Sequence, residues 1–98
     1  MSKFGELIDV QIPVLLDFYT EWNNESETMH ITLRDVAATL GDAAKVIKID
    51  VDKNEELAKA LQVKALPTLI IYKAGEMIWR QSGERDADSL INILKQYV

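Results

Sequence analysis

Cysteine is missing from all 98 residues of the sequence. Disulfide bonds, thiolate catalysis and cysteine-ligated metal sites are therefore excluded, because each of them needs a cysteine sulfur. Long apolar runs are also lacking, since those around Val14 and Leu69 have only the length of a β-strand. A bilayer needs about 20 apolar residues in a helix, so no membrane segment is expected.

Acidic residues outnumber basic residues, and the net charge is −5. This balance argues against nucleic acid as a partner, because phosphates require a basic face, and against anionic membrane surfaces. The first residues include Glu6 and Asp9 and lack a long apolar run, so we expect no secretory signal and a cytoplasmic location. Residues 1–98 have the length of a single domain.

Hydrophobic periodicity predicts alternating helices and strands. The expected helices cover residues 2–10, 24–40 and 86–97, with a short one capped by Asn54, and the expected strands cover residues 14–19, 45–51, 68–72 and 76–81. The helical connection between the first two strands favours parallel pairing, and Lys73-Ala-Gly75 predicts a hairpin. We expect inward-facing helical residues at Met29, Leu33, Val36, Ala37 and Leu40, and at Leu90, Ile93, Leu94 and Tyr97.

A polar run begins the long helix directly after Trp22: Asn23, Asn24, Glu25 and Ser26. Asparagine is a good N-cap, and acids in the first turn complement the helix dipole. Asn24 and Glu27 have the spacing of a capping box. One interpretation is that these residues only start the helix well.

The frame around this run resembles thioredoxin from about Pro13 to the C-terminus. The matching segments are Val14–Trp22, Ile47–Asp52, Ala65–Tyr72 and Lys73–Glu76. The resemblance implies an α/β fold, a three-layer α/β/α sandwich with a central four-stranded mixed sheet that lacks the family's extra N-terminal strand. The family's motif Trp-Cys-Gly-Pro-Cys falls on positions 22–26, where Asn23 and Ser26 replace both cysteines. We therefore expect no catalytic residue, no disulfide reductase activity, no metal and no cofactor.

Leu66-Pro67-Thr68 resembles the family's Ile-Pro-Thr, in which the peptide bond before proline is cis. The resemblance implies that Leu66 offers its backbone N–H and C=O to an extended peptide. Trp22, Leu66, Pro67, Thr68 and Gly83 would then form a binding groove. The alternative is that Pro67 only ends a loop and starts an edge strand.

Asp17 and Lys48 interrupt apolar strands. The resemblance matches them to a buried aspartate and a nearby lysine that assist cysteine chemistry in thioredoxins. We expect both to be inherited buried polar residues with the lysine at a distance; the alternative is a polar pair with another use. We expect burial to raise the pKa of Asp17.

His30 admits two chemical interpretations. It lies four residues after Ser26, but no third group for a catalytic triad is evident. Glu27-x-x-His30 has the spacing of helical di-metal sites, but the second copy such sites need is absent. We expect a solvated histidine.

The leading functional hypothesis is a redox-inactive thioredoxin-like protein that binds a polypeptide through the cis-proline groove, with a second copy of the chain as an alternative partner. The second hypothesis is a thiol-disulfide oxidoreductase role in cell redox homeostasis, implied by ancestry and unsupported by the residues. A third, in which Ser26 or Tyr19 holds glutathione, is disfavoured because Glu21, Glu25 and Glu27 would repel its carboxylates.

Overall fold

The computed structural model describes residues 3–98. Its elements are α1 (Lys3–Ile8), β1 (Val14–Tyr19), α2 (Asn24–Leu40), the short 3₁₀ helix η1 (Gly41–Ala43), β2 (Lys45–Asp50), α3 (Glu55–Ala60), β3 (Thr68–Lys73), β4 (Glu76–Ser82) and α4 (Ala87–Lys95). Every predicted helix and strand is present among these residues. The first and last helices are shorter than expected, and residue 2 of the first prediction lies outside the described residues.

The four strands form one mixed sheet in the order β2-β1-β3-β4. β1 pairs with β2 in parallel, as predicted, and β3 pairs antiparallel with both β1 and β4. The strand that follows Pro67 is therefore an internal strand, and the edge-strand alternative is wrong. The predicted hairpin turns through Ala74 and Gly75, which both have positive φ values, the backbone that a two-residue hairpin loop requires.

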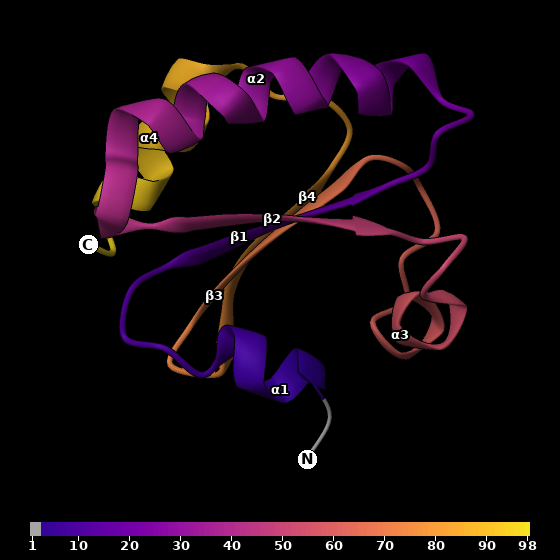
Figure 1. The fold of residues 1–98 in the computed structure, drawn as a ribbon, viewed down its shortest axis with the longest axis horizontal. Helices are drawn as coiled ribbons and strands as arrows, with labels where there is room; N and C mark the ends of the chain where they lie inside the picture. The colour runs from indigo at the N-terminus through magenta and orange to yellow at the C-terminus, as the bar shows by residue number, and fades with distance from the viewer. Residues whose placement is uncertain (1–2) are drawn as a thin grey trace.

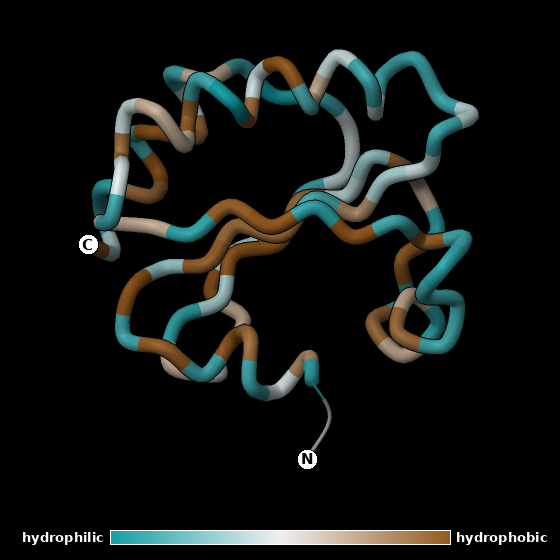
Figure 2. The backbone as a smooth tube through the Cα atoms, viewed as in Figure 1, coloured by the Kyte–Doolittle hydropathy of each residue, from teal (hydrophilic) through white to brown (hydrophobic). Residues whose placement is uncertain are grey.

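Helices cover both faces of the sheet, as Figure 1 shows, with α2 and α4 on one side and α1 and α3 on the other. Side chains alternate along β1, so Leu15 points towards α2 and α4, whereas Leu16 points towards α1 and α3. The central strands form the most hydrophobic part of the backbone trace in Figure 2. A sheet buried on both faces explains why these strands are apolar without alternation.

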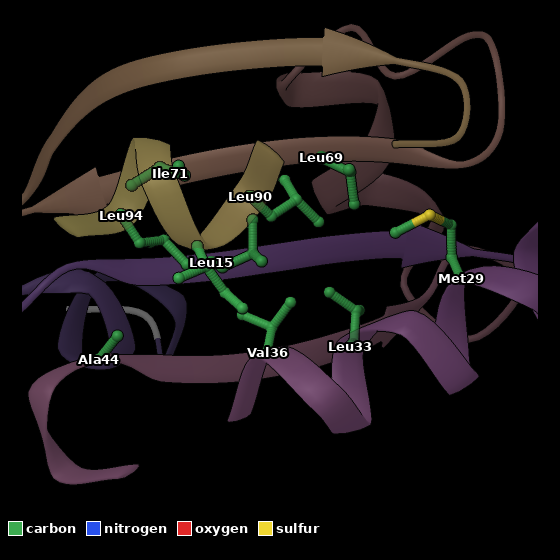
Figure 3. Packing of buried hydrophobic residues seen from close by; sticks show 10 residues of the cluster. Leu15, Met29, Leu33, Val36, Ala44, Leu69, Ile71, Leu90 and Leu94 are labelled. Atoms are coloured by element: carbon green, nitrogen blue, oxygen red, sulfur yellow. The ribbon is translucent and has the colours of Figure 1, made fainter. Parts of the chain in front are cut away.

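The core between the sheet and the helix pair α2 and α4 is built by leucines from β1, α2 and α4 (Figure 3). Leu15, Leu33, Leu90 and Leu94 are each 2 % exposed or less. Of the predicted inward positions, Ala37 is wrong because it is exposed, whereas Leu40, Ile93 and Tyr97 are half-buried. Leu40 and Ile93 pack against this core. Ile91, which was not predicted, is also buried, because α4 presents residues 90, 91 and 94 to the sheet.

A second cluster of buried residues lies on the face towards α1 and α3, and we call it the lower core. Its buried members are Ile8, Val14, Leu16, Phe18, Ile49, Ile70 and Tyr72. Leu66 packs against this cluster from the loop before β3. The lower core therefore reaches the loop that carries the predicted binding residues.

Candidate functional site

Asn23 is the N-cap of α2, the residue directly before the helix. Its backbone is extended, and its side-chain Oδ1 accepts a hydrogen bond of 3.0 Å from the backbone N–H of Ser26. This is the standard N-cap arrangement, in which a side chain satisfies one of the free N–H groups of the first turn. The capping-box prediction placed the cap at Asn24 and is wrong, because Asn24 is already inside the helix.

The same side chain reaches the loop before β3. Nδ2 of Asn23 donates a hydrogen bond of 3.4 Å to the carbonyl oxygen of Leu66. This bond uses one of the two lone pairs of the Leu66 carbonyl oxygen, so the expectation that Leu66 offers both backbone groups to a partner stays a prediction. Its N–H has no hydrogen-bond partner among residues 3–98.

Leu66 and Pro67 are joined by a cis peptide bond. Pro67 is buried, and its carbonyl oxygen accepts a hydrogen bond of 2.8 Å from the N–H of Gly83. Gly83 has a φ of +96°, which favours glycine at this turn. The loop before β3 and the turn after β4 are thus held side by side, as predicted.

Thr68 turns inward instead of lining a surface. Its side chain is fully buried, and its hydroxyl bonds to the carbonyl oxygen of Ala65 and lies 3.1 Å from the hydroxyl of Ser82. We therefore define the cis-proline surface without it, as Trp22, Leu66 and Gly83 together with the buried Pro67 that joins the last two. Thr68 is the first residue of β3, and only its backbone lies beside that surface.

Trp22 is the most exposed large apolar residue described, with 88 % of its surface accessible. Four acidic residues near it in the sequence or near Gly83 are exposed. Glu21, Glu25 and Glu27 flank Trp22 in the sequence, and Glu84 follows Gly83. An indole beside carboxylates combines apolar contact area with negative charge. Such a surface suits a partner that is apolar at its centre and basic at its edges.

Of the two polar residues expected to be buried, Asp17 is buried, and the prediction is wrong for Lys48. Asp17 is fully buried, but Lys48 is exposed, although the two are opposite each other in the β1–β2 register. Burial raises the pKa of Asp17 from 3.8 to about 7, and the charge of Lys48 opposes this rise only in part. Both carboxylate oxygens lack a hydrogen-bond partner among the described residues.

His30 is the residue that the sequence analysis misjudged. Its side chain is 26 % exposed, and its Nε2 is buried 3.7 Å from Oδ2 of Asp17. Its ring packs edge-on against Tyr19 with 4.5 Å between the ring centres. The available signal was spacing: Met29 and Leu33 face the sheet, so His30 had to lie beside that inward face.

Ser26 shows no arrangement for nucleophilic catalysis. It is fully buried, and its Oγ accepts a hydrogen bond of 3.5 Å from the N–H of Thr20. The buried Nε2 of His30 lies beside Asp17. Among residues 3–98, no group of three or more His, Asp or Glu side chains could hold a metal ion.

A helix N-terminus that meets a cis-proline loop at the edge of an α/β/α sandwich defines the class of protein: a thioredoxin-fold protein with the motif at the helix start replaced. Known proteins agree with this classification. The thioredoxin family model matches residues 1–96. The chain belongs to the thioredoxin family.

Similar proteins include a thioredoxin-like protein of Synechocystis sp., which is 37 % identical over 86 residues, covering 88 % of this chain and 82 % of the relative. Thioredoxin Y, a chloroplastic protein of Oryza sativa subsp. japonica, is 41 % identical over 91 residues, or 92 % of this chain. The chain spans only 54 % of that relative's length.

Among solved structures, a mutant thioredoxin from Halobacterium salinarum NRC-1 is similar with a TM-score of 0.88 and 30 % identity. That match covers 99 % of this chain and 84 % of the other. The predicted fold class is confirmed by this similarity and by the four-stranded mixed sheet. In residues 3–98, no helix has both the length and the apolar character that a membrane crossing demands.

Proposed function

We propose that this protein is a redox-inactive member of the thioredoxin family that binds an extended polypeptide at the cis-proline surface. Thiol–disulfide exchange needs an attacking thiolate and a resolving thiol, and these 98 residues supply neither. The oxidoreductase role implied by ancestry is therefore not proposed. Binding, unlike exchange, needs no sulfur.

The observation that carries the proposal is the pairing of an exposed indole with an unpaired backbone donor. Trp22 is 88 % exposed, and the N–H of Leu66 has no partner among the described residues. An extended peptide uses both features, because its carbonyl groups accept main-chain hydrogen bonds while its side chains contact apolar surface. Aromatic anchors contribute a large part of the energy at many interfaces.

The negative charge of the chain indicates which class of polypeptide the surface can bind. Glu21, Glu25 and Glu84 are exposed and lie close to Trp22 or Gly83 in the sequence, whereas the exposed Glu27 lines the cavity beside His30. The whole chain carries a net charge of −5. Lysine or arginine residues that flank an apolar centre would complement these carboxylates. Salt weakens attraction between exposed charges, so the affinity for such a peptide should fall as ionic strength rises.

The test compares two synthetic peptides with the same valine-leucine centre, one flanked by lysines and the other by glutamates. We expect the lysine-flanked peptide to bind, and Trp22→Ala to weaken its binding by roughly tenfold or more, as hot-spot aromatics do. The control is Met77→Ala, because Met77 is also an exposed apolar residue, at 43 %, but lies near the β3–β4 hairpin, at the other end of β4 from Gly83. Equal affinity for both peptides, or equal losses in both variants, would contradict the proposal.

Self-association is the alternative use of this surface, because a second copy could supply the same contacts. Sedimentation of the protein alone distinguishes the two: a dimer that Trp22→Ala dissociates would replace the peptide proposal.

We also propose a cytoplasmic location, which the acidic composition accommodates. Similar proteins include chloroplastic ones, so cell fractionation is the deciding measurement.

A further inference from the structure

Two buried groups without partners face each other between β1 and α2. Neither carboxylate oxygen of Asp17 has a hydrogen-bond partner among the described residues, and neither has Nε2 of His30. Oδ2 and Nε2 are 3.7 Å apart. A hydrogen bond between them needs a closure of roughly 0.7 Å, to the usual distance of about 3 Å. Buried polar groups are rarely left unpaired, so this pair calls for an explanation.

The charged and titratable groups around the pair come from three elements. Lys48 acts on both groups from β2, Tyr19 lies beside His30 on β1, and Glu27 and Arg34 act on His30 from α2 itself. On the other side of Asp17, β3 contributes Leu69, which cannot titrate. The immediate environment of Asp17 is therefore apolar apart from His30 and the opposing charge of Lys48.

This environment reverses the usual order of protonation. Burial raises the pKa of Asp17 to about 7. Burial lowers the pKa of His30 below its ordinary 6.5, with Lys48 and Arg34 acting in the same direction and Glu27 against it. The first proton therefore goes to the carboxyl group, and only the second goes to the imidazole.

We propose that Asp17 and His30 share a single proton at neutral pH, and that this proton-sharing pair fastens α2 to β1 until a second proton releases it. With one proton, the Asp17 hydroxyl donates to Nε2. With none, a tautomer with Nε2–H donates to the carboxylate. With two, Nε2 no longer accepts and the imidazolium can donate only to the carbonyl oxygen of a neutral carboxyl, so the contact is weakened and a charged ring is left beside a buried neutral group.

The structure offers the imidazolium of His30 a route away from Asp17. His30 borders a polar cavity of about 440 Å³ between β1, β2 and α2. Its other lining residues are Tyr19, Thr20, Glu21, Glu27 and Lys48. A doubly protonated pair can therefore separate by rotation of the imidazolium towards Glu27 and solvent. The carboxyl of Asp17 then stays neutral in the core.

The consequence for binding follows from the position of His30 on the helix. Ser26, one turn earlier, is held by Thr20, and Asn23 at the helix start is bonded to Leu66. Loosening α2 at His30 relaxes the turns that set Asn23 against the cis-proline loop. This second step rests on the proposed function: acidification should weaken peptide binding at that surface.

The direct test is an NMR titration of His30, whose signals need no assignment because it is the only histidine. In a coupled pair both groups report both titrations, so we expect two inflections, one near pH 7 from Asp17 and one below 6.5 from the imidazole. Asp17→Asn should remove the upper inflection. The matched control, Glu27→Gln, changes an exposed carboxylate near the same ring and should keep both inflections.

A single inflection in the wild type that Asp17→Asn leaves unchanged would overturn the inference. Peptide binding gives the second readout, with the lysine-flanked peptide measured at neutral pH and at about pH 5, where an ordinary histidine is charged. We expect the affinity ratio between the two pH values to shrink in His30→Gln. An unchanged ratio contradicts the pH regulation, whereas absence of binding at every pH contradicts the proposed function and leaves the NMR result to decide the proton pair.

Discussion

Asn23 bonds through Nδ2 to the carbonyl oxygen of Leu66 at 3.4 Å, while its Oδ1 accepts from the N–H of Ser26 at 3.0 Å. One amide thus joins the start of α2 to the loop before β3. A cysteine at this position could form neither bond with comparable strength, because its S–H is a weak donor and its sulfur a weak acceptor. The residue that replaced the family's first cysteine has become a structural connection.

Asn23→Ala should therefore lower the free energy of unfolding. Loss of the cap alone costs about 1 kcal/mol, with a range of roughly 0.5–2 kcal/mol. The control is Asn24→Ala, since Asn24 is exposed inside the helix and its side chain caps nothing. Urea unfolding of both variants checks the prediction, and equal stability losses would show that Asn23 has no special role.

Asn23→Asp separates the two bonds of the amide. A carboxylate still caps the helix and favours its dipole, but it cannot donate to the carbonyl oxygen of Leu66. The loop before β3 should then exchange its amide hydrogens faster, with α2 as stable as before. Hydrogen exchange measured segment by segment distinguishes this local result from a general loss of stability.

Patterns of apolar residues were sufficient to predict the sheet and its helices, because burial on both faces leaves a strong signal in strands such as β1 and β3. The exposure of single polar residues was harder to predict. Lys48 sits in a strand of apolar residues, yet β2 is an edge strand and leaves its side chain in solvent. The sequence alone did not show that β2 lies at an edge of the sheet.

The site was predicted as a location but not as a set of contacts. Pro67 and Gly83 are joined by a hydrogen bond, and their role in binding stays a prediction, whereas the bond between Asn23 and Leu66 joins residues 43 positions apart. No local pattern encodes such a contact. The same holds for His30 and Asp17, whose proximity depends on how α2 lies across β1.

Asp17 should make the protein more stable in mild acid than in mild base. Its folded pKa of about 7 lies above the unfolded value of 3.8, so the cost of the buried charge is absent below the lower value and complete above the higher one. A shift of this size corresponds to roughly 4 kcal/mol as an upper limit. The free energy of unfolding should fall between these pH values.

Asp17→Asn removes the charge, and we expect it to stabilise the protein by about 1–3 kcal/mol near pH 8, because the amide must still be buried. The gain should vanish towards pH 4, where the carboxyl is neutral in both states. Thermal melts at several pH values check the curve. A variant that is less stable than the wild type at about pH 8 would show that the hydrogen bond from His30 offsets the whole cost of the buried charge.

The double change Asn23→Cys, Ser26→Cys should restore a disulfide-forming pair. Position 23 caps the helix with its side chain over the N–H of residue 26, so two sulfurs at these positions can meet. The wild type should not reduce disulfides of a model protein substrate, and the oxidised double variant should lose its two free thiols in a thiol titration. The single variant Asn23→Cys is the control and should keep its thiol under the same mild oxidant.

Leu66 and Trp22 should respond differently to the same substitution, although both belong to the cis-proline surface. Leu66 is half-buried and packs against the lower core, so Leu66→Glu places a charge at the edge of that cluster. We expect a loss of about 1–3 kcal/mol, within the range for disruption of packing. Trp22→Glu changes a side chain that is 88 % exposed and should leave the free energy of unfolding within about 0.5 kcal/mol of the wild type. Chemical denaturation of the two variants measures both values. A stable Leu66→Glu protein would place this side chain in solvent and make it, like Trp22, a clean probe of binding.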